Sequence, residues 1–390
     1  MRKIGKTPFS LSIVEPEAEL CGRKEELKRL INYARDGEKV VLVSPRRYGK
    51  TTLAKKALHE IRSQDKNALT AYCSISRETT VAGVAERIAS TVLKAIASKR
   101  SLLERLTKGL TAFRPVMTLG PEGPNWTVER SAGATGSQLL EEVIRSLANI
   151  SKAPDVSICV GIDEFQTVAC IDPKGGIEAM VRDLIQDMRV SFFFIGSQRH
   201  MLTSMFSDSG RPFYRMAHRM DLPPLNESEM IPYLTQLVES AGGAISKDEA
   251  TFLARLSNGI PFFLQQIGYV AFQQGSGRMD VESIKEAFRQ VMEVERGDME
   301  SSISRLPLGQ RAMLLALAHE PTDSPYSQAY MKRHGLTSAG AITSALENLK
   351  KADFIIQETK TYKILDPFQR IILTDGMERE LLEARAGIQS

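Results

Sequence analysis

Residues Lys39 to Thr52 read KVVLVSPRRYGKTT, and they give the strongest indication of the fold. Its first five residues form an apolar run of the length of a buried strand, and a helical pattern begins after the loop. The loop, SPRRYGKT, differs from the phosphate-binding pattern G-x-x-x-x-G-K-[ST] only at Ser44, which replaces the first glycine. Backbone N–H groups of such a loop bind phosphates at the N-terminus of the following helix. We therefore expect a phosphate loop in which the φ angle of Ser44 is negative.

Each residue of the loop has a chemical role in this prediction. Gly49 lets the backbone approach the phosphates, Lys50 reaches the β- and γ-phosphate oxygens, and Thr51 offers its hydroxyl to Mg²⁺. The alternative is a basic turn with two solvated arginines, but the order of strand, loop and helix favours a phosphate loop. The other residues expected to contact the nucleotide are Ser44, Pro45, Arg46, Arg47, Tyr48 and Thr52.

A second apolar run, VSICVGIDE at residues 156–164, ends in two carboxylates. Magnesium in a nucleotide site needs a second carboxylate, and hydrolysis needs a group that orients the attacking water. Asp163 is the predicted metal-side carboxylate, and Glu164 is the predicted water-activating base. Acidic residues also end strands as solvated caps, so the combination with the phosphate loop supports these roles.

Two further kinds of group are expected near the γ-phosphate. The apolar run at 191–196 is followed by Ser197, with Gln198 beside it, and a polar side chain there can reach the γ-phosphate or the water. The alternative is a simple turn after a buried strand. Phosphoryl transfer also needs a cation to stabilise charge in the transition state. The candidates, acting on their own nucleotide or on that of a neighbouring subunit, are Arg211, Arg215 and Arg219.

The 390 residues, 42% hydrophobic and 25% charged, predict a folded chain of two or three domains. Apolar runs alternate with helical patterns up to Pro223, which indicates an α/β domain with a mostly parallel sheet. Beyond it we expect helices without strands, the last near 280–293, and then three helices and a hairpin in the order of a winged helix. The predicted divisions are a leader at 1–20, a P-loop core at 21–225 with a β-hairpin insertion at 111–136, a helical lid at 226–298 and a winged-helix domain at 299–390. The predicted core elements are strands at 39–43, 68–74, 156–162, 191–196 and 217–222, and helices at 23–35, after the phosphate loop, and at 82–99, 137–151 and 176–188.

Composition excludes several classes of protein. None of the four cysteines forms a Cys-x-x-Cys pair, which argues against a zinc site or a disulfide framework and favours reduced thiols in the cytoplasm. No stretch approaches 18 consecutive apolar residues, so we expect no membrane span. The formal net charge of +4 is too small to indicate nucleic-acid binding unless the cations gather on one face.

Four more segments carry a family resemblance: ELCGRKEEL at 19–27, PFYR at 212–215, NGIP at 258–261 and LDPF at 365–368. With the loop and the acid pair, they resemble the archaeal-type ATPase family, a branch of the AAA+/STAND P-loop ATPases, over about residues 20–370. The resemblance implies ATP and Mg²⁺ as cofactors, and an α/β P-loop core followed by a helical lid and a winged helix. It also implies that Arg23 lies near the adenine, that Pro261 begins a lid helix near the nucleotide, and that Arg215 acts in catalysis. This sequence departs from the family pattern at Cys21, where an aromatic residue is usual, at Ser44, and in PFYR, which is one residue shorter.

The predicted winged helix allows two kinds of partner. Its candidate recognition helix, 338–351, would lie in the major groove of DNA. That helix is rich in Ala, Ile and Leu and ends in Lys350 and Lys351, and residues 300–390 contain 11 basic and 11 acidic residues. Because phosphate affinity needs clustered cations, this balance slightly favours a protein partner or an autoinhibitory role over DNA.

The sequence thus predicts a Mg²⁺-dependent ATP-hydrolysing switch, whose nucleotide state controls the arrangement of the lid and the winged helix. The alternative is a nucleotide-dependent DNA-binding regulator or loader with little ATP turnover. Glu164 separates the two, because a protein that only binds nucleotide has little need for a water-activating base. An arginine that acts on a neighbouring subunit would require an oligomer on ATP binding.

Overall fold

The computed structural model describes residues 6–10, 18–97, 99–120, 123–153 and 156–386. The chain divides into two compact units. We call residues 15–44 and 50–222 the core unit, and residues 1–14, 45–49 and 223–390 the helical unit. Of the predicted leader, residues 1–5 and 11–17 lie outside the described residues.

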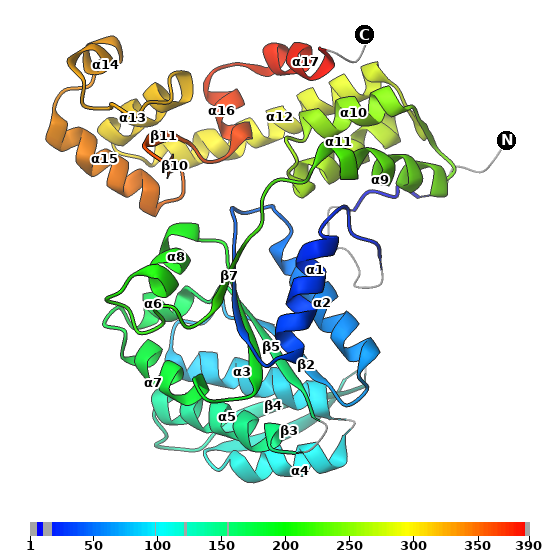
Figure 1. Ribbon diagram of the computed structural model, residues 1–390, viewed down its shortest axis with the longest axis vertical. Helices are drawn as coiled ribbons and strands as arrows, with labels where there is room; N and C mark the ends of the chain where they lie inside the picture. Colours follow the sequence, from blue (N-terminus) through cyan, green and yellow to red (C-terminus); the bar gives the residue numbers. More distant parts are fainter. Residues whose placement is uncertain (1–5, 11–17, 98, 121–122, 154–155, 387–390) are drawn as a thin grey trace. The chain divides into compact units, whose positions relative to one another are not determined.

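A five-stranded sheet forms the centre of the core unit (Figure 1). The strand order is β2-β5-β6-β1-β7, and every neighbouring pair is parallel. The three central strands are buried along their whole length, as expected for a parallel sheet that is covered on both faces. The predicted parallel α/β sheet is therefore confirmed. The strands are β1 (Lys39–Val43), β2 (Leu69–Ser74), β5 (Ile158–Asp163), β6 (Val190–Gly196) and β7 (His218–Asp221).

Alternate residues of β1 pack against opposite layers of helices. Val40 and Leu42 belong to one hydrophobic cluster, and Val41 and Val43 belong to the other. The helices of the first layer are α1 (Lys24–Arg35) and α2 (Lys50–Gln64). Those of the second layer are α3 (Val81–Ile96), α4 (Arg100–Gly109), α5 (Gly136–Ser151), α6 (Thr167–Ile171), α7 (Gly176–Ile185) and α8 (Arg199–Ser207).

Helices α4, α6 and α8 were not predicted from the sequence. They contain 10, 5 and 9 residues, so each offers only a short stretch in which a helical period can be recognised. The predicted helix at 82–99 was also too long, because α3 ends at Ile96 and α4 begins at Arg100.

Residues 111–136 contain two antiparallel strands, β3 (Phe113–Gly120) and β4 (Gly123–Arg130). The side chains of Phe113 and Val128 are buried in the hydrophobic cluster that contains Val41 and Val43. This hairpin is therefore anchored on the second layer of helices of the core unit. Its turn, residues 121–122, lies outside the described residues.

The helical unit begins with four long helices, and the expectation that no strand lies between them was wrong. Two-residue strands β8 (Ala244–Ile245) and β9 (Arg278–Met279) pair in parallel. The expected end of the last of these helices near residue 293 was also wrong, because that helix continues to Ser304 and crosses the predicted lid boundary at 298. The helices are α9 (Glu227–Ser240), α10 (Lys247–Leu256), α11 (Pro261–Gln274) and α12 (Val281–Ser304).

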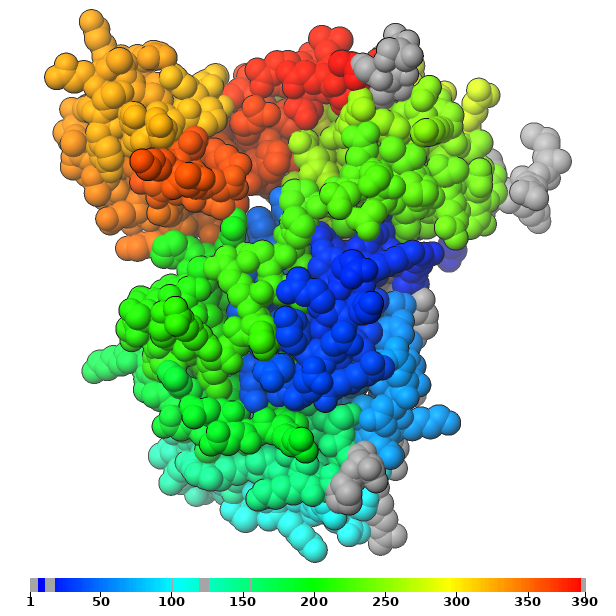
Figure 2. All heavy atoms as spheres, viewed as in Figure 1, coloured from blue at the N-terminus to red at the C-terminus, as the bar shows by residue number. Residues whose placement is uncertain are grey.

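A hydrophobic cluster of its own holds the winged helix together. Helix α15 contributes Ile342, Leu346 and Leu349 to it, while its exposed residues are mostly small, with Glu347, Asn348 and Lys351 toward its end. Figure 2 shows part of this surface in orange. The elements are α13 (Leu308–His319), α14 (Gln328–Arg333), α15 (Ala339–Lys351), β10 (Ile355–Glu358) and β11 (Thr361–Ile364), followed by α16 (Pro367–Leu373) and α17 (Met377–Arg385). In the described part of the chain, no helix combines the length and the apolar character needed to cross a membrane.

Candidate nucleotide-binding site

The phosphate loop joins β1 to α2, and its backbone has the tight turns that phosphate binding needs. Gly49 has a φ of 82°, which glycine adopts at little cost, and Arg47 has a φ of 74°. Ser44 is not among the described residues with positive φ, in agreement with the expectation for a serine at this position. Its carbonyl oxygen and its hydroxyl both accept hydrogen bonds from Lys50 Nζ, at 2.8 and 3.2 Å. The serine therefore adds an acceptor that a glycine would lack.

The metal-side residues meet where α2 begins and β5 ends. The hydroxyl of Thr51 donates to Asp163 Oδ2 at 2.8 Å. Hydroxyl and carboxylate oxygens are the ligands that Mg²⁺ prefers, and Asp163 is largely buried, so this donor set fits the ion. Tyr72 on β2 also donates to Asp163 Oδ2, and the sequence analysis missed it. Burial, reinforced by the Asp163 charge, raises the pKa of Tyr72, which keeps the phenol a hydrogen-bond donor.

The predicted base, Glu164, is held in an unusual backbone conformation. Its φ is 59°, and its N–H donates to Asp163 Oδ1 at 2.9 Å. Ser197, at the end of β6, donates to Glu164 Oε2 at 3.0 Å. The structure therefore brings these predicted residues together at the carboxyl ends of β5 and β6. A second donor to the same oxygen, Gln166 Nε2, was not found from the sequence.

The three candidate arginines differ in what they bind. Arg211 forms an ion pair with the buried Glu178, and Arg219 donates to both carboxylate oxygens of Asp221 at 2.7 and 2.8 Å. Arg215 is exposed, has a φ of 56°, and its guanidinium lies 5.1 Å from the ring centre of Tyr214. Among the described residues, no carboxylate forms an ion pair with Arg215. Of the three arginines, it is therefore the one whose charge is not already paired within the described part of the chain.

Arg23, implied to lie near the adenine, occupies the N-cap position of α1 with a φ of 65°. Its side chain is 7% exposed and donates to Glu26 Oε1 at 3.1 Å. The side chain is therefore fixed by its own helix, and its contact with a nucleotide stays a prediction.

The tip of the phosphate loop, residues 45–49, belongs to the helical unit. Arg47 Nη1 lies 2.6 Å from Glu295 Oε2 on α12, and the Arg47 guanidinium lies over the ring of Phe262 at 4.6 Å. The Phe262 N–H donates to the Arg47 carbonyl at 3.3 Å. Pro261 begins α11, and a Cβ atom on Gly49 would lie 3.8 Å from its ring. Within the helical unit, Arg47 thus contacts both α11 and α12.

This contact extends to the end of the winged helix. Phe263 stacks on Phe368 of α16, with ring centres 3.4 Å apart. Asp366 caps α16, its side chain accepting from the Phe368 N–H at 2.9 Å. Burial raises the pKa of Asp366, and the positive charge of Arg47 opposes this rise. One loop arginine is therefore close to α11, α12 and the cap of α16.

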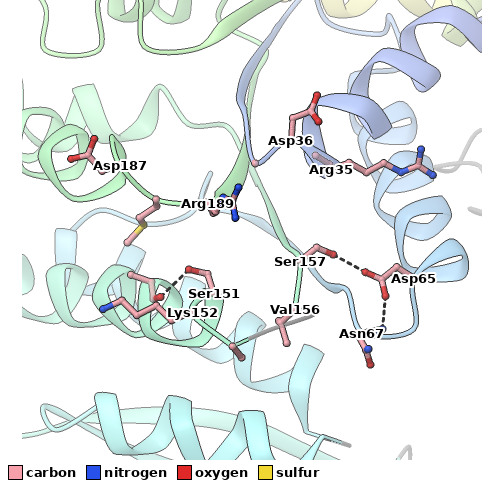
Figure 3. A pocket seen from close by; sticks show the side chains of 15 residues that line it. Arg35, Asp36, Asp65, Asn67, Ser151, Lys152, Val156, Ser157, Asp187 and Arg189 are labelled. Atoms are coloured by element: carbon pink, nitrogen blue, oxygen red, sulfur yellow. Dashed lines mark hydrogen bonds between the residues drawn. The ribbon is translucent and has the colours of Figure 1, made fainter.

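A depression of about 1050 Å³ lies at the opposite edge of the sheet (Figure 3). It is lined by turns that precede the strands, where Ser157 donates to Asp65 Oδ2 at 2.9 Å. Its rim carries both signs of charge, from residues such as Lys152, Asp187 and Arg189. Ligands of open α/β sheets bind at the carboxyl ends of strands, so the phosphate-loop edge is the candidate site.

The comparisons with known proteins agree with this assignment of the fold. The Walker-type ATPase PABY2304 of Pyrococcus abyssi matches 94% of this chain and 99% of its own, with a TM-score of 0.68 and 19% identity. The ORC2 protein of Aeropyrum pernix, in ADPNP–ADP complexes, matches 97% of this chain and 98% of its own, with a TM-score of 0.56 and 14% identity. A family model described as a probable winged helix domain matches residues 298–375. No curated protein sequence matches the chain.

The chain therefore has the fold of the Walker-type ATPase of Pyrococcus abyssi and of the ORC2 protein of Aeropyrum pernix. In particular, it is similar to the archaeal Walker-type and ORC proteins, and it carries a winged-helix domain near its C-terminus.

Proposed function

We propose that this protein is an ATP-binding, Mg²⁺-dependent ATPase that works as a molecular switch. The observation that carries the proposal is one cluster at the carboxyl ends of β1, β5 and β6. In it, Lys50 is held by Ser44, Thr51 meets Asp163, and Glu164 meets Ser197. The similar ORC2 structure contains ADP and ADPNP, which supports an adenine nucleotide, and no guanine-reading Asn-Lys-x-Asp segment occurs in the sequence.

In this proposal each group has its own step. The loop N–H groups and Lys50 would hold the β- and γ-phosphates, while Thr51 and Asp163 would hold Mg²⁺. The ion would neutralise charge on the phosphate oxygens. Glu164 would orient the attacking water, Ser197 would fix the Glu164 carboxylate, and Arg215 would stabilise charge in the transition state.

The contacts of Arg47 support the switch. When phosphates occupy the loop, its backbone must adapt to them, and Arg47 would transmit that change to Glu295 and Phe262. The stacked pair of Phe263 and Phe368 continues this path to α16. ATP and ADP would thereby favour different arrangements of the lid (226–298) and the winged helix (299–390).

Lys50→Ala tests nucleotide binding. Removal of a charged donor to the phosphates costs roughly 1.5–3 kcal/mol, so ATP affinity should fall about 10- to 100-fold. We expect the wild-type protein to hydrolyse ATP only with Mg²⁺, and the variant to bind ATP more weakly by this factor and to lose hydrolysis. The measurements are nucleotide titration and phosphate release, with exposed Lys28→Ala on α1 as the control. A wild-type protein that binds no ATP would contradict the proposal and indicate that the loop is a degenerate scaffold.

Arg47→Met tests the switch. In the wild-type protein, hydrogen–deuterium exchange of the amides of α16 should differ between the ATP and ADP states. The variant should lose this difference, because the contact to Glu295 is gone. Single and double replacements, with Glu295→Gln, should show a coupling free energy of about 0.5–3 kcal/mol in chemical denaturation. The control is Arg29→Met at an exposed arginine on α1, which should keep the nucleotide-dependent difference. If Arg47→Met kept it too, the path through Arg47 would be wrong.

The second candidate, a nucleotide-dependent DNA-binding regulator or loader with little turnover, is favoured by the winged helix match. Against it, the exposed face of α15 carries Thr343, Ser344 and Glu347, and the positive charge of the helix is confined to Lys350 and Lys351 in its last turn. DNA binding measured by fluorescence anisotropy should weaken steeply between about 50 and 200 mM salt if this candidate is right. A protein partner at the same domain, an oligomer formed on ATP binding, and a STAND-type mechanism are further parts of the proposal.

A cytoplasmic location completes the proposal, and the buried thiols support it. Burial raises the pKa of Cys73 and of Cys159 to about 12 each, so both stay protonated and chemically inert.

A further inference from the structure

Gln166 is a buried polar residue to which the proposed chemistry assigns no role. It lies three residues after Asp163, in the turn that follows β5, and its side chain is 3% exposed. A glutamine is rarely buried so fully unless its amide group has a specific partner. The partner here is the carboxylate of Glu164, which accepts from Gln166 Nε2.

The orientation of the Gln166 amide follows from this contact. Its Oε1 atom is buried and has no hydrogen-bond partner among the described residues. With the amide reversed, that oxygen would face the carboxylate of Glu164, which is repulsive, so the NH₂ group must point to Glu164. One buried acceptor is therefore left unsatisfied, which is unfavourable, while this single hydrogen bond is kept.

The backbone at the end of β6 leaves room for the Gln166 side chain. A Cβ atom on Gly196, the last residue of β6, would lie 2.2 Å from Gln166 Oε1. Glycine at this position therefore makes room for the glutamine. The Phe165 N–H also donates to the Ile195 carbonyl at 2.9 Å, which fixes the turn of Gln166 against β6.

Gln166 and Ser197 both donate to Oε2 of Glu164. Two donors on one oxygen fix the carboxylate plane and leave Oε1 to accept from a water molecule. From this geometry we infer that Gln166 is a positioning residue, which holds Glu164 in the orientation that aligns the attacking water. The kinetic part of this inference rests on the proposed hydrolysis, while its structural part does not.

Gln166→Leu removes the donor with little change of volume. Displacement of a catalytic group by about 1 Å can cost roughly 10²-fold in rate, so kcat should fall about 10- to 100-fold. The Kd for ATP should stay within about threefold, because the hydrogen bond of Gln166 goes to Glu164, and the contact between Thr51 and Asp163 is unchanged. A crystal structure of the variant should show the Glu164 carboxylate moved away from Ser197. As a control, Gln266→Leu on α11 also removes an amide with a buried, unpartnered oxygen, and it should leave kcat unchanged.

Gln166→Glu separates positioning from packing. The new carboxyl group can donate to Glu164 only while it is protonated. Turnover of this variant should therefore fall as the pH rises through the ionisation of that group, relative to the wild-type profile. Turnover that is independent of pH over this range would show that no hydrogen bond from residue 166 to Glu164 is needed.

Gly196→Ala tests the same contact from the other side. The added methyl group should displace Gln166 and lower kcat in the wild-type background, yet have little further effect in Gln166→Ala.

The outcomes separate the inference from the proposed function. Wild-type kcat in Gln166→Leu, together with an unmoved Glu164 carboxylate, would overturn the inference. If the wild-type protein hydrolysed no ATP, the proposed function would fail. The crystal structure of Gln166→Leu would still decide the structural part, with an unmoved carboxylate overturning it and a displaced one supporting it.

Discussion

Glu164→Gln should lower ATP turnover by roughly 10²–10⁴-fold, the usual contribution of general acid–base catalysis. Glutamine keeps the size of the side chain but cannot take a proton from water. Its amide oxygen can still accept from Ser197, so the local structure should persist. Asp163 and Thr51 are unchanged, and ATP should therefore bind with Mg²⁺ at near wild-type affinity. Single-turnover phosphate release and nucleotide titration measure the two effects separately.

The control for this experiment is Glu60→Gln on α2. Glu60 is partly exposed and pairs with Lys56 at 3.3 Å, more than two turns along α2 from Thr51, so the replacement should leave turnover unchanged. If Glu164→Gln turned over ATP like the wild-type protein, Glu164 would not be the base. The nucleotide-dependent regulator would then be the better reading. If turnover is lost and binding remains, the trapped ATP complex becomes the form with which to search for a protein or DNA partner.

Those parts of the site that depend on local sequence could be predicted. The run from Lys39 to Val43, the loop and the start of α2 follow one another in the chain. The strand, the turn and the helix N-terminus can therefore be recognised from one short segment of sequence. The same holds for Asp163 and Glu164, which come directly at the end of an apolar run. Parallel strands then bring these two segments to one edge of the sheet without further information.

The residues that support the site could not be predicted in this way. Tyr72 reaches Asp163 only because β2 pairs with β5 in a register that sets Tyr72 opposite Gly161. The position of the Gln166 side chain depends on the absence of a side chain at Gly196, the last residue of β6. These partners are distant in sequence and follow no periodic pattern. The spacing D-E-x-Q is a signal in retrospect, since a polar residue directly after an apolar strand can fold back onto the acid pair.

The prediction of the length of α12 was wrong for a different reason. Its second half, VERGDMESSIS, contains a glycine and has few apolar residues, so the helical period is lost after Val294. In the structure, this half is stabilised by tertiary contacts. Met299 is buried, and Glu295 lies in the ion pair with Arg47. Neither contact can be recognised within the window of the helix itself.

Arg211→Leu should destabilise the core unit by about 3–5 kcal/mol, the cost of leaving a buried charge without its partner. Glu178 is fully buried, and one of its carboxylate oxygens has no partner among the described residues. Arg211 is therefore its principal compensation. Urea denaturation followed by fluorescence suits this test, because Trp126, the single tryptophan, packs against the hydrophobic cluster of the core unit.

The control is Arg219→Ala. Arg219 and Asp221 form a bidentate pair on the surface, 38% and 48% exposed, so its loss should cost less than about 1 kcal/mol. The double variant Arg211→Leu/Glu178→Leu should recover most of the lost stability, because no buried charge remains. Equal losses of unfolding free energy for Arg211→Leu and Arg219→Ala would show that the buried pair contributes no more to stability than the surface pair.

The pH dependence of Arg211→Leu provides an independent check. Burial raises the pKa of Glu178 in the folded protein, and Arg211 opposes this rise. Without the arginine the pKa should rise further, so the folded state binds a proton that the unfolded state has already released. Stability then falls as the pH rises from the ordinary carboxyl range through the raised pKa. The loss of unfolding free energy in Arg211→Leu, relative to the wild-type protein, should consequently be smallest in acid and largest at neutral pH. A series of urea titrations at different pH values would measure it. A deficit that is independent of pH would mean that Arg211 stabilises the core unit by packing alone.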